Sequence, residues 1–383
     1  MKLFEDKNRI YDKPATHNSN TYNYYDCSSR VDIAIIRKVL NEWFDDYPDT
    51  EKNELNRRFN KSFTSAFYEL FIFNLFKLQG FKIEIHPDIP GTTKKPDFLI
   101  SKGDIEFYLE AKVAMGESEK QVSLKRRINQ IYDSLNNIKS ANFFLRIEEL
   151  IIKTKIQPSI KQFRDKIETE LKNFDPDTVT KDIQAYGLEG CPKIAIEDKN
   201  LQLIISLIPK DPQYRKENDN AIGVYPSEVF WGGEEESIKT SFSKKAKRYG
   251  RLDKPYIVCI NSIGRKFTGN YDVMNAIWGT LAISWSTNPN DIDEKIIRMN
   301  DGLFISDKGP EYKNVSGVLI THVMEFNIPN SSYWLVKHPF ADKELDFKII
   351  DMSYQYLRDG KIITTEGKTI AEIFNIKTDW LDE

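Results

Sequence analysis

Residues 63–78 read FTSAFYELFIFNLFKL, and this segment constrains the fold of the chain more than any other. Apolar side chains would cover most of the circumference of a helix with this sequence, which is typical of a helix buried on several sides. Glu69 is the only formal charge in its middle part. Burying an unpaired carboxylate is costly, so we expect Glu69 to be paired, protonated or bound to a metal ion. An arginine such as Arg57 or Arg58 is an available partner.

Three strands are predicted to follow this helix, at residues 81–85, 97–100 and 106–113. The third alternates between polar and apolar residues with a period of two. Because strand side chains alternate between faces, Glu110 and Lys112 should share one face of the sheet. The opposite face should point towards a core and carries Phe107, Leu109, Ala111 and Val113.

The acids of these strands suggest a metal site. Asp97 follows Pro96 where the second strand begins, and Glu110 and Lys112 lie on the third strand. Carboxylates and an ammonium on rigid strands suit a divalent cation held beside an activated water. The alternatives are that Asp97 is a turn residue and that Glu110 and Lys112 form a surface ion pair.

This arrangement resembles the PD-(D/E)xK nuclease superfamily, whose fold is restriction-endonuclease-like. The resemblance rests on Glu69, Pro96-Asp97 and Glu110-Ala111-Lys112, and it spans roughly residues 61–115, under a third of the chain. It implies an α/β fold with a mixed sheet flanked by helices. It also implies a helix and a further strand after the strand that carries Glu110. Either 119–141 with 143–152 or 238–249 with 255–260 could supply that pair.

The resemblance further implies Mg²⁺-dependent hydrolysis of phosphodiester bonds, with Mn²⁺ able to substitute. Asp97 and Glu110 would be metal ligands, Glu69 an auxiliary ligand, and Lys112 would place or activate water. The expected substrate is DNA, in restriction, phage defence or repair. A second hypothesis is a catalytically silent nuclease-fold module that binds nucleic acid or acts as a scaffold. A third is a hydrolase of another phosphate-containing substrate.

Basic residues gather in two places that could contact nucleic acid. Lys94 and Lys95 precede Pro96, and residues 237–266 hold the strongest local excess of positive charge. From that excess we expect Lys244, Lys245, Lys247 and Arg248 to bind phosphates. A solvated helix face is the alternative explanation for such a run.

The remaining sequence predicts an N-terminal helical extension and an additional C-terminal α/β region. We expect an N-terminal arm and helices over 1–60, a nuclease-like core with an insertion over 61–265, and a C-terminal extension over 266–383 that either packs on the same domain or forms a separate one. Residues 1–28 are predicted to be an extended arm or partly ordered tail. In the C-terminal extension we expect a helix at 272–283, two short strands within 302–321, around 312–316, and a strand-like segment at 347–351.

Composition sets the remaining limits. The 383 residues carry a net charge of −3, so any cationic surface must be local. Cys27, Cys191 and Cys259 are widely spaced, which argues against a disulfide framework or a zinc site. No stretch approaches the length of a membrane span, and we expect a cytoplasmic protein with no membrane partner. A homodimer or a defence-system partner protein is compatible with these features.

Overall fold

The computed structural model describes residues 1–116, 119–154, 157–215, 220–226, 233–267, 269–285 and 294–382. The chain divides into two compact units. Unit 1 comprises Met1–Lys13, Asn20–Gly116 and Phe230–Glu383, and unit 2 comprises Pro14–Ser19 and Glu117–Val229. The expected core therefore lies in unit 1 on both sides of an insertion, over residues 61–116 and 230–265, together with the expected C-terminal extension. The insertion is residues 117–229 of unit 2.

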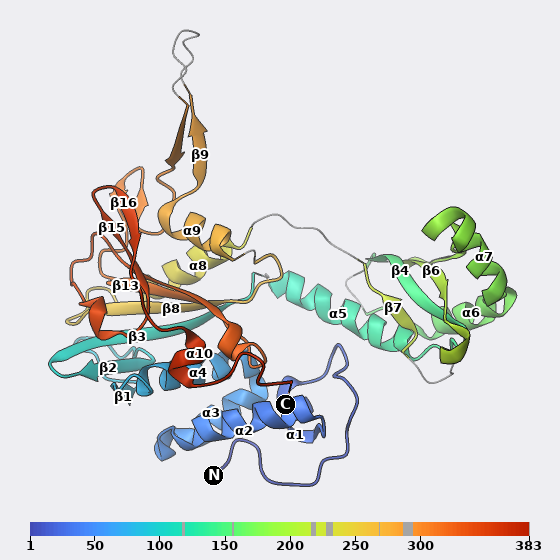
Figure 1. The fold of residues 1–383 in the computed structure, drawn as a ribbon, viewed down its shortest axis with the longest axis horizontal. Coiled ribbons are helices and arrows are strands. Elements are labelled where there is room, and N and C mark those ends of the chain that lie inside the picture. The colour runs from blue at the N-terminus through green and yellow to red at the C-terminus, as the bar shows by residue number, and fades with distance from the viewer. Residues whose placement is uncertain are drawn as a thin grey trace. The chain divides into compact units, whose positions relative to one another are not determined.

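Unit 1 is built on an eight-stranded mixed sheet (Figure 1). Its strand order is β1-β2-β3-β8-β13-β14-β15-β16. Strands β3, β8 and β13 are parallel to one another, and β1, β2 and β3 form an antiparallel meander. The strand bounds are β1 Lys82–Ile85, β2 Phe98–Lys102, β3 Ile105–Ala114, β8 Tyr256–Ser262, β13 Gly317–His322, β14 Ser332–Lys337, β15 Tyr354–Arg358 and β16 Lys361–Thr364.

Helices cover both faces of this sheet because its strands alternate as the sequence predicts. Phe107 and Leu109 pack in a core with α4 (Phe63–Lys77), which Figure 1 shows below β3. Tyr108 belongs to a second core, with α8 (Glu235–Ala246) and α9 (Asn270–Trp278) on the opposite face. Every residue of the central strand β8 is buried. The predicted alternation of β3 is thus confirmed.

The strand parallel to β3 settles which segment continues the motif. β8 pairs with β3 in register, with Glu110 opposite Val258 and Lys112 opposite Ile260. The chain reaches β8 through α8, which contacts both strands. The segment 143–152 instead belongs to unit 2. Of the two possible helix–strand pairs, 238–249 with 255–260 is therefore the one that joins the main sheet.

The N-terminal residues are not a loose tail. Leu3 and Phe4 are each 1% exposed, and the Phe4 ring stacks on Tyr22 with 5.1 Å between ring centroids. Three helices follow this segment, and α2 and α3 contact α4. Their bounds are α1 Thr21–Cys27, α2 Val31–Asp45 and α3 Asp49–Lys61. The predicted arm is wrong for residues 21–27, which form α1, whereas residues 1–13 contain no helix and are anchored to unit 1 by two buried apolar side chains.

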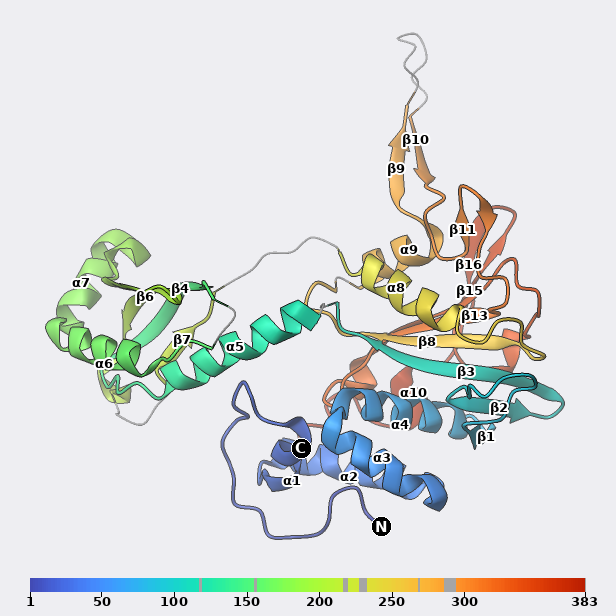
Figure 2. The same ribbon diagram turned by 180° about the vertical axis from the view of Figure 1, so that it is seen from behind.

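The C-terminal part of unit 1 departs from the prediction at two places. The predicted helix 272–283 ends at Trp278, because the chain leaves the helical conformation at Gly279, which has a φ of 92°. A Cβ there would lie 1.9 Å from the Met299 carbonyl oxygen, so the position requires glycine. A projecting hairpin of β9 (Leu281–Ser284) and β10 (Lys295–Arg298) follows, as Figure 2 shows.

The short strands expected within 302–321 are present: β11 (Ile305–Ser306) and β12 (Gly309–Pro310) precede 312–316, and β13 begins directly after it. Between them Tyr312 has a φ of 48°, which is incompatible with a strand. The strand-like segment expected at 347–351 instead begins with a 3-10 helix, Phe347–Ile349, which the Asp346 side chain caps. Another 3-10 helix, Ile328–Asn330, and α10, Ile370–Phe374, complete unit 1.

Unit 2 has its own four-stranded sheet, ordered β5-β6-β4-β7, and its own apolar core. Asp133 ties residues 14–19 to it by accepting from the backbone N–H groups of His17 (2.9 Å) and Asn18 (3.1 Å). Its elements are α5 Glu119–Asn136, β4 Phe143–Ile152, α6 Lys161–Glu170, α7 Pro176–Tyr186, β5 Lys193–Glu197, β6 Leu201–Pro209 and β7 Ile222–Val224, with 3-10 turns at Leu171–Asn173, Gly187–Gly190 and Pro212–Tyr214.

Candidate metal and nucleic-acid site

Asp97 lies where β2 begins, half-buried against β3. Its Oδ2 accepts a hydrogen bond of 2.7 Å from the backbone N–H of Ala111, and its carbonyl oxygen accepts one of 3.0 Å from His86. The side chain is therefore fixed beside the residue that follows Glu110. A solvent-facing turn residue would not be held in this way.

Glu110 is 1% exposed, and three side chains of the segment around the end of α8 surround its carboxylate. Lys245 Nζ and Arg248 Nη1 donate to Oε1, the latter at 3.3 Å. The Tyr249 hydroxyl donates to Oε2 and also, at 2.8 Å, to the Lys95 carbonyl oxygen. The expected alternative of a surface pair between Glu110 and Lys112 is wrong, since Glu110 is buried and bound by other cations.

The negative charge of Glu110 acts on the carboxyl group of Asp97. Burial, then the charge of Glu110 and then that of Glu69, raise the pKa of Asp97 to about 7. The Lys245 ammonium and the Ala111 N–H act in the opposite direction. The nearby cations therefore do not offset the cost of burying the Asp97 charge beside Glu110 and Glu69. A divalent cation is one species that would stabilise that charge.

Lys112 lies two residues beyond Glu110 on the same face of β3 and is exposed. Partial burial of its ammonium, together with the charges of Lys245 and Lys244, lowers its pKa. Within the described ranges, no carboxylate lies at ion-pair distance from it. Its amine is therefore available to a phosphate or a water molecule in front of β3.

Glu69 has a different environment. Arg58 donates to both of its oxygens, and the Tyr47 hydroxyl donates to Oε1 at 2.9 Å. Its pairing with an arginine is the alternative that the sequence left open. Among the described residues Glu69 does not form a three-ligand group with Asp97 and Glu110, so its expected role as an auxiliary metal ligand is not supported. Its charge still reaches Asp97, whose pKa it helps to raise.

The expected phosphate-binding cations do gather near these acids. Lys94 donates to the Arg248 carbonyl oxygen at 2.9 Å, which ties the loop before Asp97 to the end of α8. Lys245 and Arg248 neutralise Glu110, whereas Lys95 pairs with Asp88 at 2.9 Å. The Lys247 ammonium lies 5.5 Å from the centre of the Tyr312 ring, and Lys244 is close enough to influence Lys112.

Tyr249 is the contact residue that the sequence analysis missed. It directly follows the basic run Lys244–Arg248, and this position at the end of a lysine-rich helix was the signal in the sequence that could have identified it. It also links the loop before Asp97 to Glu110. It therefore positions both acids relative to each other.

Few side chains at this site could act as ligands of a metal ion. In the part of the chain that the structure describes, no three His, Cys, Asp or Glu side chains lie close enough together to hold a metal ion. The three-ligand set Asp97, Glu110 and Glu69 is thus corrected to two carboxylates. Mg²⁺ is commonly bound by one or two carboxylates, with water and substrate phosphate completing its shell. Asp97 and Glu110 fit that requirement.

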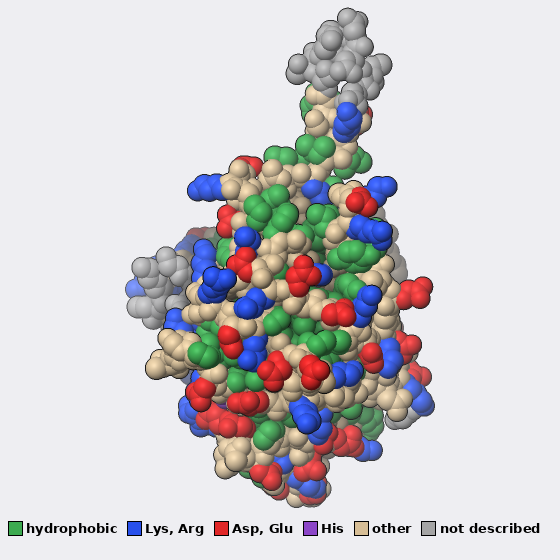
Figure 3. Space-filling view, turned by 90° about the vertical axis from the view of Figure 1, so that its left-hand side faces the viewer, with side chains coloured by type: hydrophobic (Ala, Val, Ile, Leu, Met, Phe, Trp, Pro, Cys, Tyr) green, Lys and Arg blue, Asp and Glu red, His purple; other side chains and the backbone are tan. Residues whose placement is uncertain are grey.

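Charge elsewhere on unit 1 is mixed. Figure 3 shows acidic and basic side chains interspersed over one face, with apolar side chains gathered below the β9–β10 hairpin.

No helix among the described residues is both long and apolar enough to cross a bilayer. Comparison of the chain with family models, curated proteins and solved structures finds no match.

Proposed function

We propose that the protein is a metal-dependent nuclease of the PD-(D/E)xK type that hydrolyses phosphodiester bonds of DNA. The observation that carries this proposal is that Asp97 is held beside the residue after Glu110, on the strand that also carries the exposed Lys112. Burial, and then the charge of Glu110, raise the pKa of Asp97 to about 7. A buried carboxyl group with a raised pKa does not help to stabilise the fold. Ionisable groups whose pKa is perturbed in this way are concentrated at functional sites.

The topology of unit 1 supports the proposal. The order is helix α4, antiparallel strands β1, β2 and β3, helix α8, and then β8 parallel to β3. The resemblance predicts a helix and a further strand after the strand that carries Glu110. Unit 2 enters between β3 and α8 without interrupting that order.

The roles of the residues follow from their contacts. Asp97 Oδ1 has no protein donor in the described part of the chain, and with Glu110 it would hold the cation. The bound cation would lower the pKa of a water molecule and stabilise the attacking and leaving oxygens. Lys112 would orient that water and the phosphate. Lys245 and Arg248 neutralise Glu110 in the metal-free protein and are close enough to contact the DNA backbone.

A cleavage assay tests the proposal. Linear and supercoiled DNA are incubated with the full chain in Mg²⁺, Mn²⁺ or EDTA. We expect metal-dependent cleavage that Lys112→Ala and Asp97→Asn abolish. Lys82→Ala on β1 and Asp104→Asn in the β2–β3 turn are matched controls, because both residues are exposed and outside the site. Full cleavage by Lys112→Ala, or no cleavage of any nucleic acid by the wild type, would contradict the proposal.

A catalytically silent binding module is the second candidate. The observation that favours it is that both oxygens of Glu110 already accept hydrogen bonds from protein side chains. The donors are Lys245, Arg248 and Tyr249, and they could hold Glu110 in a purely structural role. Thermal unfolding with Mn²⁺ separates the two. A nuclease site predicts a saturable rise in the midpoint that Asp97→Asn removes. A silent module predicts the same midpoint with and without the metal.

A further inference from the structure

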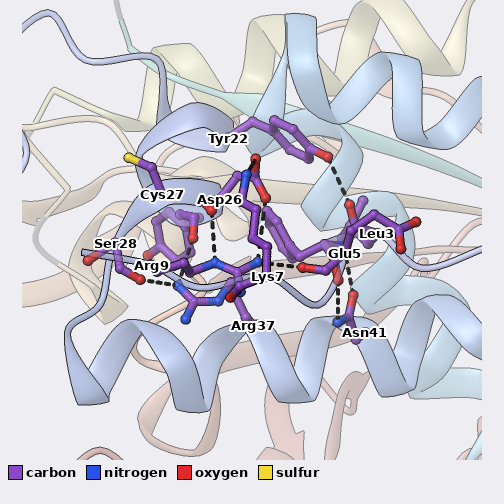
Figure 4. Close-up of polar contacts among 12 residues, drawn as sticks. Leu3, Glu5, Lys7, Arg9, Tyr22, Asp26, Cys27, Ser28, Arg37 and Asn41 are labelled. Atoms are coloured by element: carbon purple, nitrogen blue, oxygen red, sulfur yellow. Dashed lines mark hydrogen bonds and ion pairs between the residues drawn. The ribbon is translucent and has the colours of Figure 1, made fainter. Parts of the chain in front are cut away.

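A cleft of about 470 Å³ lies between the N-terminal segment and the outer side of α2. Its lining includes Arg9, Arg37 and Lys38. Figure 4 shows Arg9 and Arg37 approaching each other from the N-terminal segment and from α2. The cleft is formed within unit 1 by residues other than those around Asp97. Its volume is in the range of small-molecule sites.

Arg37 is a buried cation, and among the residues that the structure describes no carboxylate lies at ion-pair distance from it. It is 8% exposed, and its Nη1 donates at 2.7 Å to the carbonyl oxygens of both Tyr25 and Ser28. Its Nε and Nη2 groups have no acceptor among the residues that the structure describes. A guanidinium offers further N–H donors in a fixed planar fork, so donors remain at the cleft.

Arg9 places a second positive charge beside the first. Three carbonyl oxygens fix its guanidinium, those of Asp26 (2.8 Å), Lys7 (3.1 Å) and Glu5 (2.7 Å). Burial and then the charge of Arg9 lower the pKa of Arg37. The nearest carboxylate, Asp26, already serves both Arg9 and Lys7. Two guanidiniums held together in this way attract an anion.

We propose that this cleft binds the phosphate group of a small phosphorylated molecule of nucleotide size. A guanidinium matches phosphate with two parallel hydrogen bonds, and partial burial strengthens them. The remainder of the ligand would meet Asp6, Glu42 and Asp45, which also line the cleft. Those carboxylates favour hydroxyl or amine donors and disfavour a polyanion such as a nucleic-acid strand.

A purely structural role of Arg37 is the competing explanation. Tyr25 and Ser28 lie at the C-terminal end of α1, where a cation stabilises the free carbonyl groups. This explanation uses only Nη1 and leaves the cleft without a ligand. The two accounts therefore differ in whether phosphate compounds bind.

Calorimetry and thermal unfolding of the full chain separate them. The probes are AMP, inorganic phosphate and adenosine, each compared with NaCl at equal ionic strength. We expect saturable binding of AMP, weaker binding of phosphate and none of adenosine. Arg37→Gln should weaken AMP binding at least about tenfold, as expected when a charge-assisted contact is lost. Arg30→Gln, a surface arginine paired with Asp32, should bind as the wild type does.

Lys38→Glu keeps the test decisive if Arg37→Gln does not fold. Lys38 is exposed on α2, and reversing its charge at the cleft should also weaken AMP binding several-fold. Unchanged AMP affinity in a folded Arg37→Gln or in Lys38→Glu would overturn the proposal. So would the absence of any AMP effect on the wild type, or binding only to vesicles that carry phosphorylated lipid headgroups.

Discussion

Two acidic side chains of unit 1 have similar partners but different surroundings. Glu69, on α4, is held by Arg58 and Tyr47, and Glu110, on β3, is held by Lys245, Arg248 and Tyr249. One tyrosine and at least one cation satisfy each carboxylate. What differs is the neighbourhood, because only Glu110 has a second carboxylate held on the adjacent strand and a free lysine two residues away.

That difference indicates which acid belongs to a functional site. A carboxylate matched by its own arginine has a net charge near zero and can be understood from folding alone. Asp97 adds a second acid to Glu110, and burial first and the charge of Glu110 second raise its pKa. Burial of an acid is therefore a weak criterion for a site, and an uncompensated excess of acids is a stronger one.

The largest expected effect is on cleavage and separates the two glutamates. Glu110→Gln should reduce the Mg²⁺-dependent rate by more than about 100-fold, because even the partners of metal ligands cost roughly 10- to 100-fold when removed. Glu69→Gln should retain most of the rate once the protein is folded. Single-turnover cleavage at saturating Mg²⁺ measures both. Equal losses in the two variants would remove the distinction between the acids.

Stability should show the reverse order. Glu69→Gln leaves the Arg58 guanidinium without its carboxylate, and we expect a loss of about 2 to 3 kcal/mol in the free energy of unfolding. Urea unfolding followed by circular dichroism measures it. Glu54→Gln, which breaks an exposed pair with Arg57, should leave the unfolding midpoint unchanged. A Glu69→Gln variant as stable as the wild type would show that the pair is not needed for folding.

A smaller effect concerns pH. The pKa of Asp97 is about 7 in the folded protein and about 4 in an unfolded chain. Between these values the folded state binds the extra proton, so its stability falls as pH rises through this window. The free energy of unfolding of the wild type relative to Asp97→Asn should therefore be higher near pH 5 than near pH 8. A constant or opposite difference in urea unfolding would show that the pKa is not raised.

The smallest expected effect is that of Tyr249→Phe. It removes the hydroxyl that donates to Glu110 and to the Lys95 carbonyl oxygen. We expect a loss of about 1 kcal/mol in stability, the usual net value of one hydrogen bond, and a smaller loss of cleavage than in Glu110→Gln. Unfolding and cleavage measured on one preparation test both expectations. A rate as low as that of Glu110→Gln would instead give the hydroxyl a direct role in the chemistry.

The sequence predicts the local parts of this site well. The burial of α4 and the alternation of β3 follow from side-chain periodicity, which depends only on neighbouring residues. The partners of Glu110 could not be derived in this way, since Lys245 lies 135 residues further along the chain. The insertion between them folds around its own core, with patterns as apolar as those of the main sheet.

The errors in the C-terminal region have a related cause. Residues 272–283 read as one apolar helix, but the helix ends where Gly279 adopts a φ of 92°. The strand-like segment 347–351 instead begins with a 3-10 helix that the Asp346 side chain caps. Both features depend on contacts or backbone angles that periodicity does not encode. Similarly, the burial of Leu3 and Phe4 depends on helices that come later in the sequence.

The most direct measurement is anomalous scattering from a crystal of the wild-type protein soaked in Mn²⁺. The account predicts one strong peak between the carboxylates of Asp97 and Glu110, with Lys245 moved off Glu110, and no peak at Glu69. A crystal with Mn²⁺ bound only elsewhere, or with Glu110 still held by Lys245 at saturating Mn²⁺, would contradict it.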